Sequence, residues 1–222
     1  ILPDAVNVSG GAVGEEVAPW LDIVRKQGVL LGALSDELPT SLSVDVRGEL
    51  ASEDVDILKL SALRGLFSAV IEDAVTFVNA PSLAEERGVT ADVTKASESP
   101  NHRSVVDVRA VYGDGTVVNV AGTLTGPQHV EKIVNINGRN FDLRAEGKNL
   151  IVTYDDRPGS LGRIGTALGD AGVDIAAAAL SQDAEGGGAT ILLRVDRDVA
   201  QDVRDAIAAS VGATTIELVD LS

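Results

Sequence analysis

Apolar and polar residues follow two different periods in the first two thirds of the chain. Leu42, Val44 and Val46 alternate with polar residues, and this period of two predicts a strand over 40–51. Apolar residues at helical spacing predict helices over 15–34 and 54–71, and a shorter helix begins near Pro81 and ends before Gly88. The remaining segments of this part are expected to be strands and hairpin arms, over 89–97, 104–112, 116–124, 133–136 and 140–144.

From Leu150 onward the pattern changes to a regular succession of short elements. Strands are expected over 150–154, 173–180, 189–195 and 214–219, with helices over 161–171 and 199–211. This β-α-β-β-α-β order is the ferredoxin-like arrangement. The fold class is therefore α+β, and the chain divides into a first domain over 1–146 and a second over 147–222. Residues 1–13, with Gly10-Gly11, are expected to be a linker or an entering strand.

Composition limits which partners and which cellular compartment are expected. The chain of 222 residues carries 18 Lys and Arg against 34 Asp and Glu, a formal charge of −16 that argues against nucleic acid and anionic membranes. There is no cysteine and no methionine, and the first residue is Ile1, so we expect a piece of a longer protein. No secretory signal and no apolar run of membrane-spanning length are visible, which predicts a soluble, cytoplasmic protein.

Catalytic, cofactor-binding and metal-binding residues are not expected in this chain. Gly113-Asp114-Gly115 lies between two strands, so it indicates a turn and not a dinucleotide fingerprint. His102 and His129 lie in polar segments near prolines, where a solvated turn is the simpler interpretation.

The turn after Tyr154 is a candidate binding site for a small zwitterion. Free backbone N–H groups at Ser160, Leu161 and Gly162 begin a helix, and such groups favour a carboxylate. Asp156 could face an ammonium group and Tyr154 could supply a hydroxyl. An alternative interpretation is that Asp155 and Asp156 only cap the helix and that Pro158-Gly159 only makes a turn.

The segments Tyr154–Gly165 and Ala171–Ile175 resemble the opening of an ACT domain, a β-α-β-β-α-β module that binds amino acids. Upstream, four segments and the C-terminus resemble the intervening domain and the ending of long-form D-3-phosphoglycerate dehydrogenases of the actinobacterial type. These segments are Val44–Leu50, Leu66–Pro81, Lys95–Val108, Asn135–Arg144 and Ile216–Ser222. The resemblance covers essentially the whole chain.

The resemblance implies a parent enzyme that oxidises 3-phosphoglycerate with NAD in the first step of serine biosynthesis and is inhibited by L-serine. It implies that the catalytic and NAD-binding domains precede Ile1, and that the protein is a homo-oligomer. Serine in this family sits between paired ACT domains. Tyr154, Asp156 and Asp174 match its contacting positions, the last replacing an asparagine, so that a side chain that donates and accepts becomes one that only accepts.

The resemblance also implies a second site for a phosphorylated hydroxy or keto acid, or for phosphate. Its basic residues match Lys132, Arg144 and Arg194, and Asn140 stands where the family has a histidine. Two cations are compatible on one hairpin face when an anion bridges them. A three-residue loop over 137–139 would pair Lys132 with Arg144 on one face, whereas a two-residue loop would place them on opposite faces, so we expect three residues or a bulge.

Two other functions fit the same sequence. The chain could act as an assembly module that joins catalytic subunits without sensing a ligand. It could also be an amino-acid-binding module of a different enzyme.

Overall fold

The computed structural model describes residues 13–71, 74–183 and 186–222, so nearly all of the expected N-terminal linker lies outside the described residues. The chain forms two compact units, Ile1–Ile133 and Val134–Ser222. No helix of the described residues is long and apolar enough to cross a membrane.

The first unit contains a mixed sheet with one buried face. Its strands are β1 (Ser41–Gly48), β2 (Thr90–Ala96), β3 (Ser104–Val111), β4 (Val117–Thr125) and the first part of β5 (Val130–Ile136). The sheet order is β2-β1-β3-β4-β5-β6, and β1 pairs in parallel with β2 and antiparallel with β3. Leu42, Val44 and Val46 are fully buried, which confirms the predicted core face of β1.

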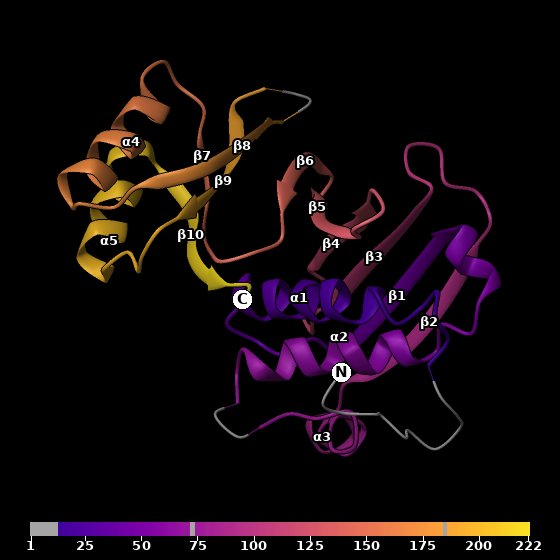
Figure 1. Ribbon diagram of the computed structural model, residues 1–222. Helices are drawn as coiled ribbons and strands as arrows, with labels where there is room; N and C mark the ends of the chain where they lie inside the picture. The colour runs from indigo at the N-terminus through magenta and orange to yellow at the C-terminus, as the bar shows by residue number, and fades with distance from the viewer. Residues whose placement is uncertain (1–12, 72–73, 184–185) are drawn as a thin grey trace. The chain divides into compact units, whose positions relative to one another are not determined.

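Two long helices of this unit, α1 (Trp20–Ala33) and α2 (Ile57–Ser68), lie side by side over the sheet (Figure 1). A short 3₁₀ helix, Glu49–Ser52, follows β1, and α3 (Ala80–Arg87) ends at the left-handed Gly88, as predicted. The helix pair approaches closely because glycines lie at the crossing. A Cβ atom on Gly65 would lie 1.8 Å from the carbonyl oxygen of Arg25, and one on Gly28 would lie 2.1 Å from that of Ala62.

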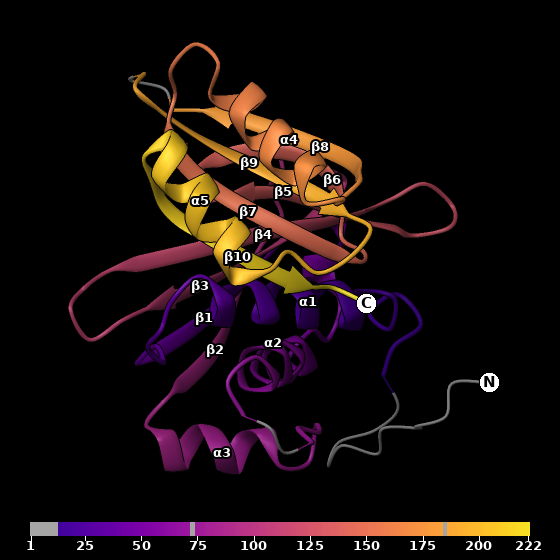
Figure 2. The same ribbon diagram turned by 90° about the vertical axis from the view of Figure 1, so that its left-hand side faces the viewer.

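The second unit contains a four-stranded antiparallel sheet covered on one face by two helices (Figures 1 and 2). Its elements are β7 (Lys148–Asp155), α4 (Ser160–Asp170), β8 (Ile175–Gln182), β9 (Gly188–Val195), α5 (Gln201–Val211) and β10 (Ala213–Asp220). The sheet order β10-β7-β9-β8 and the element order confirm the ferredoxin-like prediction. Apolar residues of both helices, β7 and β9 form the core, whereas no residue of β8 belongs to it.

A hairpin of β5 and β6 (Arg139–Arg144) precedes this sheet. The predicted domain boundary at residue 146 follows the hairpin, whereas the two compact units divide inside β5. The division falls there because β6 packs beside β8. On the face of the β7–β10 sheet that the helices leave uncovered, Ile151 and Leu192 are also buried, at most 3% exposed.

Candidate ligand-binding site

The end of β7 carries a buried hydroxyl group without a partner. Tyr154 is 2% exposed and its ring belongs to the core of the second unit. Among the described residues, its Oη has no hydrogen-bond partner. Burial, and then the negative charge of the nearby Asp156, raises the pKa of Tyr154 above its ordinary value, so the hydroxyl stays protonated. An unsatisfied buried hydroxyl costs free energy, and a polar ligand would remove that cost.

Asp156 lies just beyond the end of β7 and is anchored by two interactions. Its backbone N–H donates to the carbonyl of Gly187 at 3.1 Å, and its Oδ2 accepts a hydrogen bond from the side-chain amide of Gln182. The carboxylate is partly exposed. It can therefore accept a hydrogen bond from a cationic group of a ligand beside the Tyr154 hydroxyl.

The turn into α4 is built differently from the expectation. Gly159 has φ 87° and the N–H of Ser160 donates to the carbonyl of Arg157 at 3.0 Å, which is typical of a type II turn with proline and glycine at its centre. The N–H of Ser160 is thus engaged, so the prediction that it is free for a ligand is wrong. The next two N–H groups, of Leu161 and Gly162, lie in the first turn, where helix geometry provides no intrahelical acceptor.

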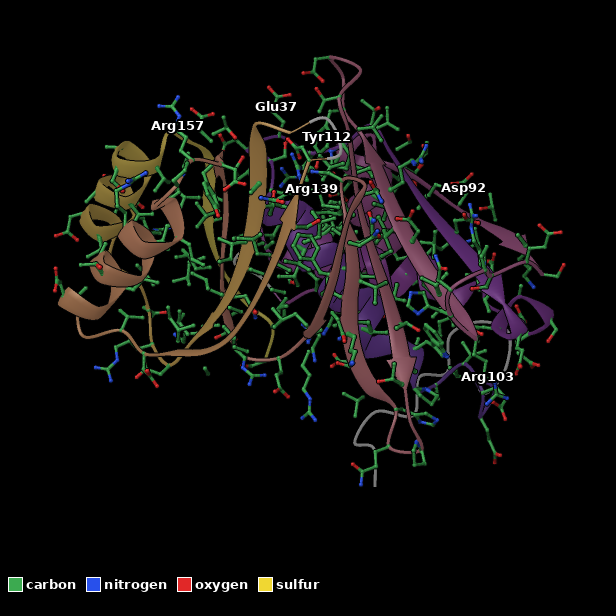
Figure 3. The ribbon with its side chains drawn as sticks, turned by 90° about the horizontal axis from the view of Figure 1, so that it is seen from above. Glu37, Asp92, Arg103, Tyr112, Arg139 and Arg157 are labelled. Atoms are coloured by element: carbon green, nitrogen blue, oxygen red, sulfur yellow. The ribbon has the colours of Figure 1, made fainter. Side chains whose placement is uncertain are left out.

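Side-chain capping does not explain the two aspartates at this turn. No side chain caps α4 at Gly159, and the carboxylate of Asp155 pairs instead with Arg157 at 3.0 Å. Arg157 points into solvent in Figure 3, and its side chain is 74% exposed. Neither aspartate caps α4, which counts against the alternative interpretation and leaves the Asp156 carboxylate available to a ligand.

Asp174, the third expected contact, lies at the other end of the same sheet. It precedes β8, and its N–H donates to the Asp196 carboxylate at 2.8 Å. The ladder pairs Gln182 and Tyr154 with Ala189 at one end of β9, and Ile175 with Val195 at the other. Seven residues of strand separate the two ends, roughly 23 Å at the usual rise. One chain therefore cannot bring Asp174 to a small ligand at Tyr154 and Asp156.

The strand between these two ends is an edge. β8 pairs only with β9 in its sheet, and most of its residues are exposed. Ile175 is 37% and Leu180 42% exposed, and Leu161 in the first turn of α4 is 52% exposed. An apolar edge strand of this kind is a template for pairing with another strand.

The β5–β6 hairpin contradicts the expected loop. β5 ends at Ile136 and β6 begins at Arg139, which leaves Asn137-Gly138 as a two-residue loop with φ 51° and 81°. Positive φ at both positions is the geometry of a type I′ turn, which Asn-Gly adopts readily. Asn135 accepts from the N–H of Gly138 and donates to Asn140, both at 3.0 Å, and these bonds close the turn. The prediction of a three-residue loop is wrong.

This turn changes the expected anion site. Asn140 shares a face with Asn135, and Arg144, four residues on, lies on that face too. Strict alternation would place Lys132 with Val134 and Ile136 on the other face, whereas a bulge in the hairpin would bring Lys132 to the face of Arg144. Arg194 forms an ion pair with Glu146. The cluster of Lys132, Arg144, Arg194 and Asn140 stays a prediction.

Comparison with known proteins follows the same division of the chain. Residues 16–137 match the family of the D-3-phosphoglycerate dehydrogenase intervening domain, and residues 148–212 match the ACT domain. The chain belongs to the D-3-phosphoglycerate dehydrogenase intervening-domain family. The ACT match covers β7 to α5, and thus every candidate contact for an amino acid.

Relatives named D-3-phosphoglycerate dehydrogenase match the chain along its length. The protein of Mycobacterium bovis is 75% identical over 221 residues, that of Mycobacterium leprae 73%, and that of Bacillus subtilis 26% over 206 residues. The chain spans 42% of the length of the two mycobacterial relatives and 39% of that of the Bacillus relative.

The ACT domain contains two residues near the candidate site that the sequence did not single out. Gln182 donates to Asp156, and Asp183 forms an ion pair with Arg139 of the hairpin at 2.6 Å. Their partners are 26 and 44 residues away in the chain. No local pattern reports such pairings, although polar residues at the end of an otherwise apolar strand were a usable signal.

Proposed function

We propose that this chain is the regulatory part of a D-3-phosphoglycerate dehydrogenase and that its ACT domain binds L-serine between two copies. The supporting observation is the Tyr154 hydroxyl, which is buried beside Asp156 and has no partner among the described residues. A core tyrosine with an unsatisfied hydroxyl is explained by a polar ligand that completes its hydrogen bonding.

The groups around Tyr154 fit the three functional groups of L-serine. The Asp156 carboxylate binds the ammonium group in a charge-assisted hydrogen bond. The N–H groups of Leu161 and Gly162, at the positive end of the α4 dipole, bind the carboxylate. Asp174 from a second copy accepts a hydrogen bond from the serine hydroxyl or ammonium, since a carboxylate can only accept.

Two copies are needed because Asp174 lies at the opposite end of β8 from Asp156. Antiparallel pairing of two β8 edges brings the start of one β8 to the end of the other. A twofold axis then creates two equivalent sites, each with Tyr154 and Asp156 from one copy and Asp174 from the other. The same pairing covers the exposed apolar residues of β8.

Regulation follows from differential binding. L-serine that bridges two ACT domains favours the paired arrangement that holds both halves of the site, and by linkage it shifts the population of the whole enzyme toward that arrangement. The regulated activity, NAD-dependent oxidation of 3-phosphoglycerate, is proposed for the part of such a protein outside this chain.

Calorimetric titration with L-serine tests the proposal. The unmodified chain is expected to release or absorb heat at millimolar ligand, and Asp156→Ala is expected to abolish the signal. Asp170→Ala removes an exposed carboxylate at the other end of α4 and serves as the matched control, with binding unchanged. No heat from the unmodified chain would refute serine binding.

The exposed β8 edge also supports a second candidate, an assembly module without a ligand. Sedimentation of the same samples separates the two functions. Pairing that is insensitive to L-serine, together with a silent titration, would favour assembly alone.

A further inference from the structure

The end of β8 carries two consecutive side chains that point to opposite faces of the ACT sheet. Gln182 shares the helix-covered face with Leu180, and Asp183 points to the other face, where Arg139 lies. We propose that Gln182 is a positioning residue of the amino-acid site, which fixes the Asp156 carboxylate so that the site prefers a ligand with a free ammonium group. This inference rests on the proposed function and deepens it.

The sheet register explains how Gln182 reaches Asp156. Tyr154 and Gln182 both lie opposite Ala189, so the three residues form one row across β7, β9 and β8 on the helix-covered face. Ala189 is fully buried and has only a methyl side chain. Because the Ala189 side chain is short, the longer Gln182 side chain can extend across it toward β7. Its amide there donates to Asp156 Oδ2.

The hydrogen bond leaves Asp156 able to bind a cation. A carboxylate has two oxygens and about four acceptor positions, and Gln182 uses one of them. The amide is neutral, so it orients the carboxylate without cancelling its charge. The carboxylate is thereby held beside the Tyr154 hydroxyl before the ligand arrives, which lowers the entropic cost of binding.

The strand end that carries Gln182 is itself held in place. The N–H of Asp183 donates to the carbonyl of Gly188 at 2.9 Å, which closes the β8–β9 ladder at this end. The Asp183 carboxylate accepts from Arg139 of β6 at 2.6 Å, and Figure 3 shows Arg139 beside these strands. The ion pair of Asp183 on one face of the sheet restrains the backbone next to Gln182. The Gln182 side chain on the other face therefore holds Asp156 from a fixed position.

Two substitutions of Gln182 distinguish a role in positioning the Asp156 carboxylate from a role in packing alone. Gln182→Ala removes the donor, and we expect L-serine binding to weaken about tenfold, because the Asp156 side chain must then be ordered when the ligand binds. Gln182→Lys keeps a donor on a long side chain but adds a positive charge that neutralises Asp156 and repels the ammonium. We expect it to weaken binding about a hundredfold, and added salt to recover part of that loss.

Gln201 provides the matched control. Its amide donates to Asp205 on α5 at 2.8 Å, the same pair of residue types in the same domain. Gln201→Ala and Gln201→Lys should bind L-serine like the unmodified chain in the same titration. Binding by Gln182→Ala that equals the unmodified chain, or binding by Gln182→Lys that is tighter than by Gln182→Ala, would overturn the inference while leaving the proposed function standing. An unmodified chain that gives no heat with L-serine would overturn both the inference and the proposed function.

Discussion

Glycines in the helices of the two units have opposite surroundings. Gly28 and Gly65 lie at the crossing of α1 and α2, where a Cβ would meet backbone oxygens at 2.1 and 1.8 Å. Among the described residues, nothing lies within 4 Å of a Cβ added to Gly162, Gly165 or Gly169 of α4. Glycine weakens a helix in both cases, and only in the first unit does this chain itself supply a packing reason for it.

The difference lies in whether one chain alone covers the surface on which the glycines lie. The helix pair of the first unit fills its own contact, so its glycines are explained within one chain. In the ACT domain the open glycines of α4 accompany the exposed Leu161 and an edge strand, β8, that contributes nothing to the core. The explanation that fits our proposal is a second copy seated against these elements.

Among the substitutions that test this comparison, the largest loss of stability is expected at the α1–α2 crossing. Gly65→Ala places a methyl group where the Arg25 carbonyl lies, so the helices must separate, and we expect a loss of about 3 kcal/mol in the free energy of unfolding. The single tryptophan, Trp20, lies buried on α1, and its fluorescence during urea unfolding reports this unit.

Gly165→Ala is the matched substitution in the ACT domain. Since the added methyl group meets none of the described residues of its own copy, we expect helix propensity to stabilise the unpaired domain by about 0.5–1 kcal/mol, measured by circular dichroism at a concentration where copies do not pair. Equal effects of the two substitutions would contradict the comparison.

Tyr→Phe substitution at the two buried tyrosines is expected to change the stability of the two units in opposite directions. Tyr112, labelled in Figure 3, is 4% exposed and its hydroxyl donates to the Leu31 carbonyl at 3.3 Å, whereas the Tyr154 hydroxyl has no partner among the described residues. We expect Tyr112→Phe to destabilise its unit by about 1 kcal/mol and Tyr154→Phe to stabilise the ACT domain by a similar amount.

Tyr154→Phe should also weaken L-serine binding, by about tenfold, because the ligand loses the hydroxyl that it would satisfy. Urea unfolding and calorimetry on the same samples check both effects. A Tyr154→Phe variant that is less stable than the unmodified chain would show that the hydroxyl already has a partner.

The smallest expected effects concern pH, and again the two units differ in sign. Burial raises the pKa of Asp107 in the first unit, although it accepts from the Asn119 amide. The side chain of Arg197 and the N–H of Asp174 lower the pKa of the exposed Asp196 in the ACT domain. A raised carboxyl pKa means that the folded state holds the proton more tightly, so stability falls as pH rises above the ordinary value. A lowered pKa gives the reverse slope.

Single Asn substitutions isolate these slopes. Asp107→Asn should gain stability relative to the unmodified chain as pH rises from about 4 to 7. The deficit of Asp196→Asn should shrink as pH falls below about 4, where the unmodified aspartate also becomes protonated. Thermal unfolding across this pH range measures both, and slopes of the same sign would contradict the assignment.

The sequence predicted the elements of both units because their apolar periods are clear. Leu42, Val44 and Val46 marked β1, and the β-α-β-β-α-β order marked the ACT domain. The prediction for the β5–β6 loop was wrong because the loop length was chosen to bring Lys132 and Arg144 to one face, although Asn137-Gly138 by itself favours a two-residue turn. Asp174 was grouped with Tyr154 by resemblance, but their separation depends on strand order, which local patterns do not report.

The most direct test of the two-copy site is complementation between two inactive variants. Asp156→Ala and Asp174→Ala each damage every site of their own pair, so each alone should fail to bind L-serine in calorimetry. When the two are mixed and allowed to exchange, half of the pairs are mixed, and each mixed pair contains one intact site. We predict that binding returns at about a quarter of the sites. Continued silence of the mixture, with L-serine still bound by the unmodified chain, would contradict a site shared between two copies.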